Sequence, residues 1–208
     1  MTARRLLLVR HGETDYNREG RCQGHLDVPL NETGRAQARS IAARLATRDL
    51  VHCSSSDLER ARSTAEMIVG QRDLTIELSP DLREAHLGVL QSHLYSDFGT
   101  ILGEDAEYLT RPGVRSKPPG GESPLDLRRR ARRFVSQLGE TEKGLPPGEI
   151  LLVGHGLLLR ALLTVLLGLP TEAAFAFRFR NCALTVVDWR PGGRSQLVTF
   201  NDRAHLPR

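Results

Sequence analysis

An arginine and a histidine follow the first apolar run of the chain, at residues 6–12 (LLLVRHG). The four apolar residues predict a short buried strand, and open α/β sheets bind their ligands beyond the carboxyl ends of such strands. Gly12 leaves room for a group to approach the backbone. The Arg10 guanidinium can bind phosphate oxygens and the His11 imidazole can attack phosphorus, so the turn is a candidate phosphate site with a nucleophile.

Two later stretches carry related chemistry. Residues 150–156 read ILLVGHG, so His155 also follows a short apolar strand and precedes a glycine, Gly156. Between the two predicted strands, Ser56 and Glu59 have the spacing of a capping box, which predicts the start of a helix. Arg60 then lies in the first turns of that helix, where free backbone N–H groups and the helix dipole favour an anion.

At these positions the chain resembles the histidine phosphatase superfamily, also called the phosphoglycerate mutase-like family. The resemblance runs from Leu6 to about Val187. It is carried jointly by RHGET at 10–14, SSDLERARSTAE at 55–66, LRE at 82–84, GGES at 120–123 and GHG at 154–156. Each motif alone is weak, but together they are highly specific.

The resemblance implies roles for single residues. The implied phosphate-binding residues are Arg10, Asn17, Gln23, Gly24, Arg60, Glu84, His155 and Gly156. Glu84 matches the proton donor of the family, which suits a reaction whose leaving alkoxide must be protonated. After Glu84 the chain departs from the common pattern, because Val89-Leu90-Gln91-Ser92 stands where many relatives have an aromatic residue and Glu-Gly. The departure makes the wall that faces the substrate harder to interpret.

The implied reaction needs neither a metal nor another cofactor. Two arginines and two imidazoles can neutralise the charge that magnesium neutralises in other phosphoryl transfers, and the sequence shows no acidic cluster or metal-ligand spacing. His11 is expected to attack phosphorus and form a phosphohistidine, while Arg10, Arg60 and His155 hold the equatorial oxygens. Glu84 is expected to protonate the leaving oxygen and then deprotonate the attacking water.

A cysteine nucleophile is the rival chemistry. Six residues, 54–59, separate Cys53 from Arg60, and none is glycine, whereas a cysteine-phosphatase loop has five residues between its thiolate and its arginine. Cys22, Cys53 and Cys182 are an odd number without a CxxC pair, which argues against a disulfide scaffold or a zinc site. All three are expected to be small buried hydrophobic residues.

Composition and charge limit the partners. The chain has 208 residues and a net charge of +4, which suits small anionic metabolites and gives no support for nucleic-acid binding. The longest apolar stretch, Leu157 to Leu167, is interrupted by Arg160 and is too short to span a membrane. We expect a cytoplasmic protein without membrane contact, and the sequence leaves a homodimer open.

Periodicity predicts the elements that position these residues. One helix is expected from about Thr33 to Leu45, and the helix that carries Arg60 is expected to end at about Val69. A third is expected to begin at Pro124, and a fourth to cover Leu157 to Leu167. Strands are expected at 50–53, 183–189 and 195–200. The arginines at 128, 129, 130, 132 and 133 are expected on a solvated helix face. Strands that alternate with helices predict a single domain, 1–208, with a three-layer α/β/α sandwich and a mainly parallel mixed sheet.

Three functions stay open: a phosphomonoesterase acting on small phosphorylated metabolites, a cofactor-dependent phosphoglycerate mutase, and a non-catalytic phosphate-binding module. The module is disfavoured because both the nucleophile and the acid are present. The related mutases are longer after the acid and carry a tyrosine and lysines there that have no clear match, so the phosphomonoesterase is favoured. Residues 93–121 are expected to form a lid that sets specificity, and its basic residues Arg111, Arg115 and Lys117 favour small phosphorylated acids.

Overall fold

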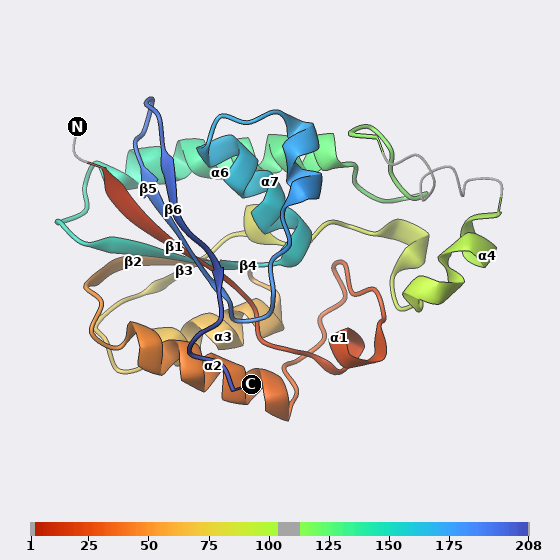
Figure 1. Cartoon of the computed structure of the whole chain (residues 1–208), viewed down its shortest axis with the longest axis horizontal. Coiled ribbons are helices and arrows are strands. Elements are labelled where there is room, and N and C mark those ends of the chain that lie inside the picture. The colour runs from red at the N-terminus through yellow and green to blue at the C-terminus, as the bar shows by residue number, and fades with distance from the viewer. Residues whose placement is uncertain (1–2, 104–112, 208) are drawn as a thin grey trace.

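Six strands form one mixed sheet in the computed structural model, which describes residues 3–103 and 113–207. The strands are β1 Arg4–Arg10, β2 Leu50–Ser55, β3 Ile76–Leu78, β4 Glu149–Gly154, β5 Leu184–Trp189 and β6 Gln196–Asp202. Their order is β3-β2-β4-β1-β5-β6 (Figure 1). The first four in this order pair in parallel, and β5 is antiparallel to both of its neighbours, β1 and β6. The mainly parallel mixed sheet is as predicted.

Helices cover both faces of the sheet (Figure 1). The α-helices are α1 Asp15–Glu19, α2 Glu32–Leu45, α3 Glu59–Val69, α4 Phe98–Leu102, α6 Pro124–Glu142 and α7 Gly156–Leu166. Alternate residues of β1 face opposite layers: Leu6 and Leu8 pack with residues of α6 and α7, and Leu7 and Val9 with residues of α2 and α3. This arrangement is the predicted three-layer sandwich.

The two central strands place the two histidines at one edge. β1 and β4 each contain four consecutive buried apolar residues, as strands covered on both faces do. Arg10 is opposite Gly154 in the parallel register, and the His11 N–H donates to the Gly154 carbonyl at 3.0 Å. His11 and His155 therefore leave the sheet side by side at its carboxyl edge.

The helix that carries Arg60 begins differently from the prediction. α3 starts at Glu59 after an extended Leu58, so the predicted capping box of Ser56 and Glu59 is wrong. The Ser56 hydroxyl accepts a hydrogen bond from the Leu58 N–H at 3.3 Å, inside the turn. An Asp27 carboxylate from a distant loop accepts from the Glu59 N–H at 2.7 Å and caps the helix in place of a local side chain.

Two short elements were not predicted. The polar stretch after His11 contains α1, which a capping box between Thr14 and Asn17 starts and Gly20 ends. β3 has only three residues at the edge of the sheet. The segment 93–121 contains α4 and a 3-10 turn at Tyr95–Asp97, while Tyr108 and Arg111 lie outside the described residues.

Two of the five arginines predicted on a solvated face of α6 are buried. The start of α6 is as predicted, with Ser123 as N-cap and a capping box to Asp126. Arg128 donates to the Thr164 hydroxyl of α7 at 2.9 Å, and Arg130 forms an ion pair with Glu122 at 2.8 Å. The covered face of α6 is thus wider than its apolar stripe: a carboxylate balances the charge of Arg130, and a hydroxyl accepts from Arg128.

The described part of the chain contains no helix with both the length and the apolarity that a membrane crossing requires. The single domain and the homodimer stay predictions.

Candidate active site

His11 is buried at the carboxyl end of β1, with 2% of its surface exposed. Its Nδ1 lies 2.7 Å from the carbonyl oxygen of Gly12, a contact that requires the proton on Nδ1. Burial, and then the charges of Arg10 and Arg60, lower the pKa of His11 well below its usual value. The imidazole is therefore neutral near pH 7, and its Nε2 is left with a lone pair that can attack an electrophile.

The backbone around His11 is held by side chains from two other elements. The Gly12 N–H donates to the Thr64 hydroxyl of α3 at 3.1 Å. The Asn181 amide, 170 residues along the chain, donates to the His11 carbonyl at 2.9 Å. A Cβ on Gly12 would lie 2.5 Å from the Gly34 carbonyl oxygen, so this turn packs against the start of α2 without space for a side chain.

Arg10 and Arg60 are anchored through their outer nitrogens. Arg10 Nη1 donates to the Phe179 carbonyl at 2.9 Å, and Arg60 donates to the carbonyls of Leu26 at 2.7 Å and Gly24 at 2.8 Å. Burial lowers the pKa of Arg60 to about 10, so the guanidinium is still charged at neutral pH. The Nε of each arginine is buried without a hydrogen-bond partner among the described residues.

His155 completes the polar cluster. It precedes α7, and its ring centroid lies 5.1 Å from that of His11. Burial, and then the charge of Arg60, lower the pKa of His155 well below its usual value. Within residues 3–103 and 113–207, seven buried side-chain polar atoms lack a partner, and four of them are Nε of Arg10, Nε of Arg60 and both ring nitrogens of His155. Because buried unpaired polar atoms are costly, their concentration makes this cluster a candidate binding site for an anion.

Glu84 lies at the amino terminus of α7. Its Oε1 accepts hydrogen bonds from the backbone N–H groups of Ala85 at 3.0 Å, Leu157 at 3.0 Å and Leu158 at 3.2 Å. A Cβ on Gly156 would lie 3.6 Å from Arg10 Nε and 3.7 Å from Glu84 Oε2. The glycine therefore stands between the guanidinium and Glu84 Oε2, which also accepts from the Leu157 N–H at 3.3 Å, and it lies beside His155.

The other predicted phosphate residues, Asn17, Gln23 and Gly24, lie in the segment that follows His11. Gln23 is buried, and its Oε1 accepts from the Thr14 hydroxyl at 3.0 Å. Gly24 has a φ of +53°, and in this conformation its carbonyl accepts a hydrogen bond from Arg60. Gly24 therefore helps to fix the position of the guanidinium. Asn17 Oδ1 accepts from the Asn181 amide at 3.2 Å, which links Asn17 to the backbone of His11.

Arg130, which was predicted to be solvated, holds the backbone at Glu84. The guanidinium of Arg130 donates to the carbonyls of Asp81 at 3.0 Å, Arg83 at 2.5 Å and Glu84 at 3.0 Å, and it pairs with Glu122. Arg130 could not be distinguished from the other arginines at 128–133 in the sequence. The one available signal was its partner Glu122, which is the glutamate of the GGES motif. His25 is also close, with Nε2 2.8 Å from the Glu84 carbonyl oxygen.

The cysteines lie away from this chemistry. Cys53 is fully buried in β2, and burial raises the pKa of its thiol to about 12, so no thiolate is available at neutral pH. Cys22 and Cys182 are also buried, as expected for small hydrophobic residues. In the described ranges, no three His, Cys, Asp or Glu side chains are grouped so that they could hold a metal ion.

Comparison with known proteins agrees with this geometry. The chain is 39% identical over 188 residues to "Probable phosphoglycerate mutase GpmB" of Photorhabdus laumondii, covering 88% of this chain and 84% of that protein. The structure matches a mycobacterial glucosyl-3-phosphoglycerate phosphatase with a TM-score of 0.87 and 35% identity, over 97% of this chain and 100% of the other. It matches the alpha-ribazole phosphatase of Shigella flexneri with a TM-score of 0.85 and 31% identity, over 96% and 97%.

The family model of the histidine phosphatase superfamily (branch 1) matches residues 6–203. That range contains both paired histidines and every residue of the cluster described above. The chain belongs to the histidine phosphatase superfamily.

Proposed function

We propose that the protein is a phosphomonoesterase that acts on small phosphorylated metabolites through a phosphohistidine on His11. The observation that carries the proposal is the set of buried, unpartnered nitrogens around a neutral imidazole. Phosphate oxygens would accept from Arg10, Arg60 and His155 and so satisfy these donors. A neutral His11, held with its proton on Nδ1, has the free Nε2 that a nucleophile needs.

The first half of the reaction transfers the phosphoryl group to the protein. His11 Nε2 forms a bond to phosphorus while the bond from phosphorus to the alcohol oxygen breaks. Glu84 gives its proton to the departing oxygen, and the two guanidinium groups neutralise the charge on the equatorial oxygens.

The second half regenerates the imidazole. Glu84, now a carboxylate, takes a proton from a water molecule as the water oxygen bonds to phosphorus. The bond between phosphorus and Nε2 breaks, and its electron pair returns to His11. Inorganic phosphate and the alcohol are the products, and no metal enters either step.

The test is to trap the intermediate. Brief incubation with ³²P-labelled phenyl phosphate and an alkaline quench should leave label on the protein that is stable to base and lost in acid. His11→Ala should carry no label, whereas His52→Ala, which changes a histidine on β2 outside the cluster, should be labelled like the wild type. Label that persists in His11→Ala would refute the assignment of the nucleophile.

A mutase is the second candidate, because the relatives from Photorhabdus laumondii and Yersinia pestis carry that name. A mutase must keep the phosphohistidine from water and return the phosphoryl group to the substrate. The discriminating assay incubates 3-phosphoglycerate with the enzyme, with and without 2,3-bisphosphoglycerate, and follows 2-phosphoglycerate and inorganic phosphate together. Formation of 2-phosphoglycerate many times faster than phosphate release from any monoester would replace the phosphatase proposal.

A further inference from the structure

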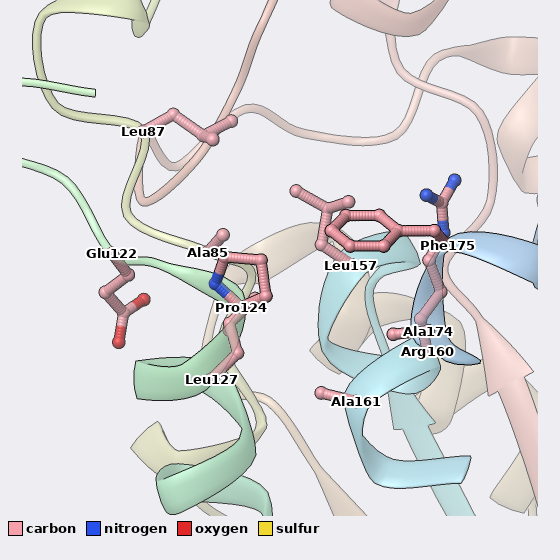
Figure 2. A pocket seen from close by; sticks show the side chains of 10 residues that line it. All are labelled: Ala85, Leu87, Glu122, Pro124, Leu127, Leu157, Arg160, Ala161, Ala174 and Phe175. Carbon is pink, nitrogen blue, oxygen red and sulfur yellow. The ribbon is translucent and has the colours of Figure 1, made fainter. Parts of the chain in front are cut away.

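A pocket of about 90 Å³ lies beside the proposed catalytic acid. Figure 2 shows Ala85, Pro124 and Leu127 on one wall, and Leu157, Arg160 and Phe175 on the facing wall. Ala85 and Leu157 also donate their backbone N–H groups to the Glu84 carboxylate. Two residues of the pocket thus contact the group that would protonate the leaving alcohol, which places the pocket on the side from which the alcohol part of a phosphomonoester can approach Glu84.

The walls are mostly apolar. Leu157, Leu127 and Pro124 contribute aliphatic surface, and Phe175 at the 3-10 helix Thr171–Ala176 is 48% exposed. Apolar walls leave the hydroxyl groups of a sugar without partners, so they disfavour a polyhydroxylated alcohol. They favour an alcohol with an aliphatic or aromatic body.

Two charged side chains line the pocket, Glu122 and Arg160. The charge of Glu122 is already balanced, because both of its oxygens accept hydrogen bonds from Arg130, at 3.2 and 2.8 Å. Arg160 differs: among the described residues it forms no side-chain hydrogen bond or ion pair, and its Nε is buried without a partner.

The position of Arg160 in the fold makes this unusual. α7 is otherwise almost wholly apolar, and although Arg160 as a whole is only half-buried, its Nε is a buried donor that a ligand in the pocket would satisfy. Burial lowers the pKa of Arg160, while the charge of Glu84 raises it and the charge of Arg178 lowers it further.

We infer that this pocket binds the alcohol part of the substrate and that Arg160 binds a carboxylate on it. The inference rests on the proposed function and names its substrate class: phosphate esters of hydroxy acids with a compact apolar body. A single planar guanidinium matches a carboxylate through two parallel hydrogen bonds. The small volume and the single unpaired cation among the described residues that line the pocket fit this group better than a second phosphate dianion.

The test compares two aryl esters that differ by one group, phenyl phosphate and 4-carboxyphenyl phosphate. The measured quantity is the ratio of kcat/KM for the carboxylated ester to kcat/KM for phenyl phosphate, which cancels any general effect of a substitution. In Arg160→Gln this ratio should fall by about tenfold or more relative to the wild type, mainly through a higher KM for the carboxylated ester. Arg132→Gln, which changes an exposed arginine of α6, should leave the ratio unchanged.

Two results would overturn the inference. An equal loss on both esters would assign Arg160 to the charge balance of Glu84, and an unchanged ratio would remove it from binding. If Arg160→Gln does not fold, Arg160→Lys and Phe175→Ala still decide the matter. Arg160→Lys should lower the ratio by less, and Phe175→Ala should weaken both aryl esters but not methyl phosphate; failure of either result counts against the pocket. Wild-type protein that hydrolyses neither ester would refute the proposed function itself.

Discussion

The ion pair of Arg130 and Glu122 should stabilise both the fold and the position of Glu84. The two side chains are 9% and 24% exposed, and Arg130→Gln would leave the Glu122 carboxylate without its counter-ion. Burial raises the pKa of Glu122, but the hydrogen bond and charge of Arg130 outweigh it and hold the pKa below its usual value. Removing one partner of a buried pair costs about 3–5 kcal/mol; because Glu122 is partly exposed, we expect about 3 kcal/mol.

Urea unfolding measures this loss. With a slope of about 3 kcal/mol per molar urea, Arg130→Gln should lower the unfolding midpoint by about 1 M. Arg133→Gln is the matched control: Arg133 is on the same helix and pairs with Asp81 at 2.7 Å, but its side chain is 60% exposed. Its midpoint should hardly move. The double variant Arg130→Gln/Glu122→Gln should recover part of the loss, because no carboxylate is left unpaired.

The same variants test the position of Glu84. Arg130 holds the carbonyls of Arg83 and Glu84, so Arg130→Gln should lower kcat more for an alkyl phosphate, whose alkoxide needs a proton, than for p-nitrophenyl phosphate. Arg130→Lys should restore part of the activity. If Arg130→Gln and Arg133→Gln unfold at the same urea concentration, the argument from burial is wrong. If the kcat loss does not depend on the leaving group, Arg130 is only structural.

Four further predictions follow from the site. Arg60→Lys keeps the charge but loses the donor fork, and kcat/KM should fall by about two decades in steady-state assays. Glu84→Gln should impair alkyl phosphates far more than p-nitrophenyl phosphate; equal damage would make Glu84 structural. His11 and His155 have pKa values lowered from 6.5, so they stay neutral in the fold while the unfolded chain protonates. The free energy of unfolding should therefore be unaffected by these groups above pH 6.5 and fall below it, by up to about 1.4 kcal/mol per pH unit for each, and His155→Asn should flatten this slope in urea titrations. Prolonged EDTA treatment should leave the rate unchanged, and a loss that only added divalent ions restore would contradict the arginine and imidazole mechanism.

The local signals in the sequence predicted the sheet and the core of the candidate site. The runs before His11 and His155 are strands buried on both faces, whose continuous apolar pattern is hard to mistake, and their common edge brings the two histidines together. The resemblance added Glu84, which composition alone could not distinguish from a surface carboxylate.

What the sequence did not show depends on contacts between distant segments. The cap of α3 is Asp27, whereas the capping-box spacing pointed to Ser56, because spacing cannot reveal a side chain that arrives from another loop. Asn181 reaches His11 across 170 residues and has no local pattern of its own. Arg160 did leave a signal, as the one charge in an apolar stretch, but only the structure shows that it faces a pocket.

The place of β1 in the sheet bears on how the protein is made. β1 precedes its two neighbours in the sheet, β4 and β5, by more than a hundred residues along the sequence, so it leaves the ribosome well before either of them. Phe179 and Asn181, which anchor Arg10 and the His11 backbone, are later still than β4. A nascent chain that has not yet reached these residues lacks the groups that anchor Arg10 and the His11 backbone, so the candidate site should be complete only after residue 181 has been made. Pairing between segments that are so far apart in the sequence is slow, so the apolar residues of β1 stay without their partner strands until β4 and β5 have been made.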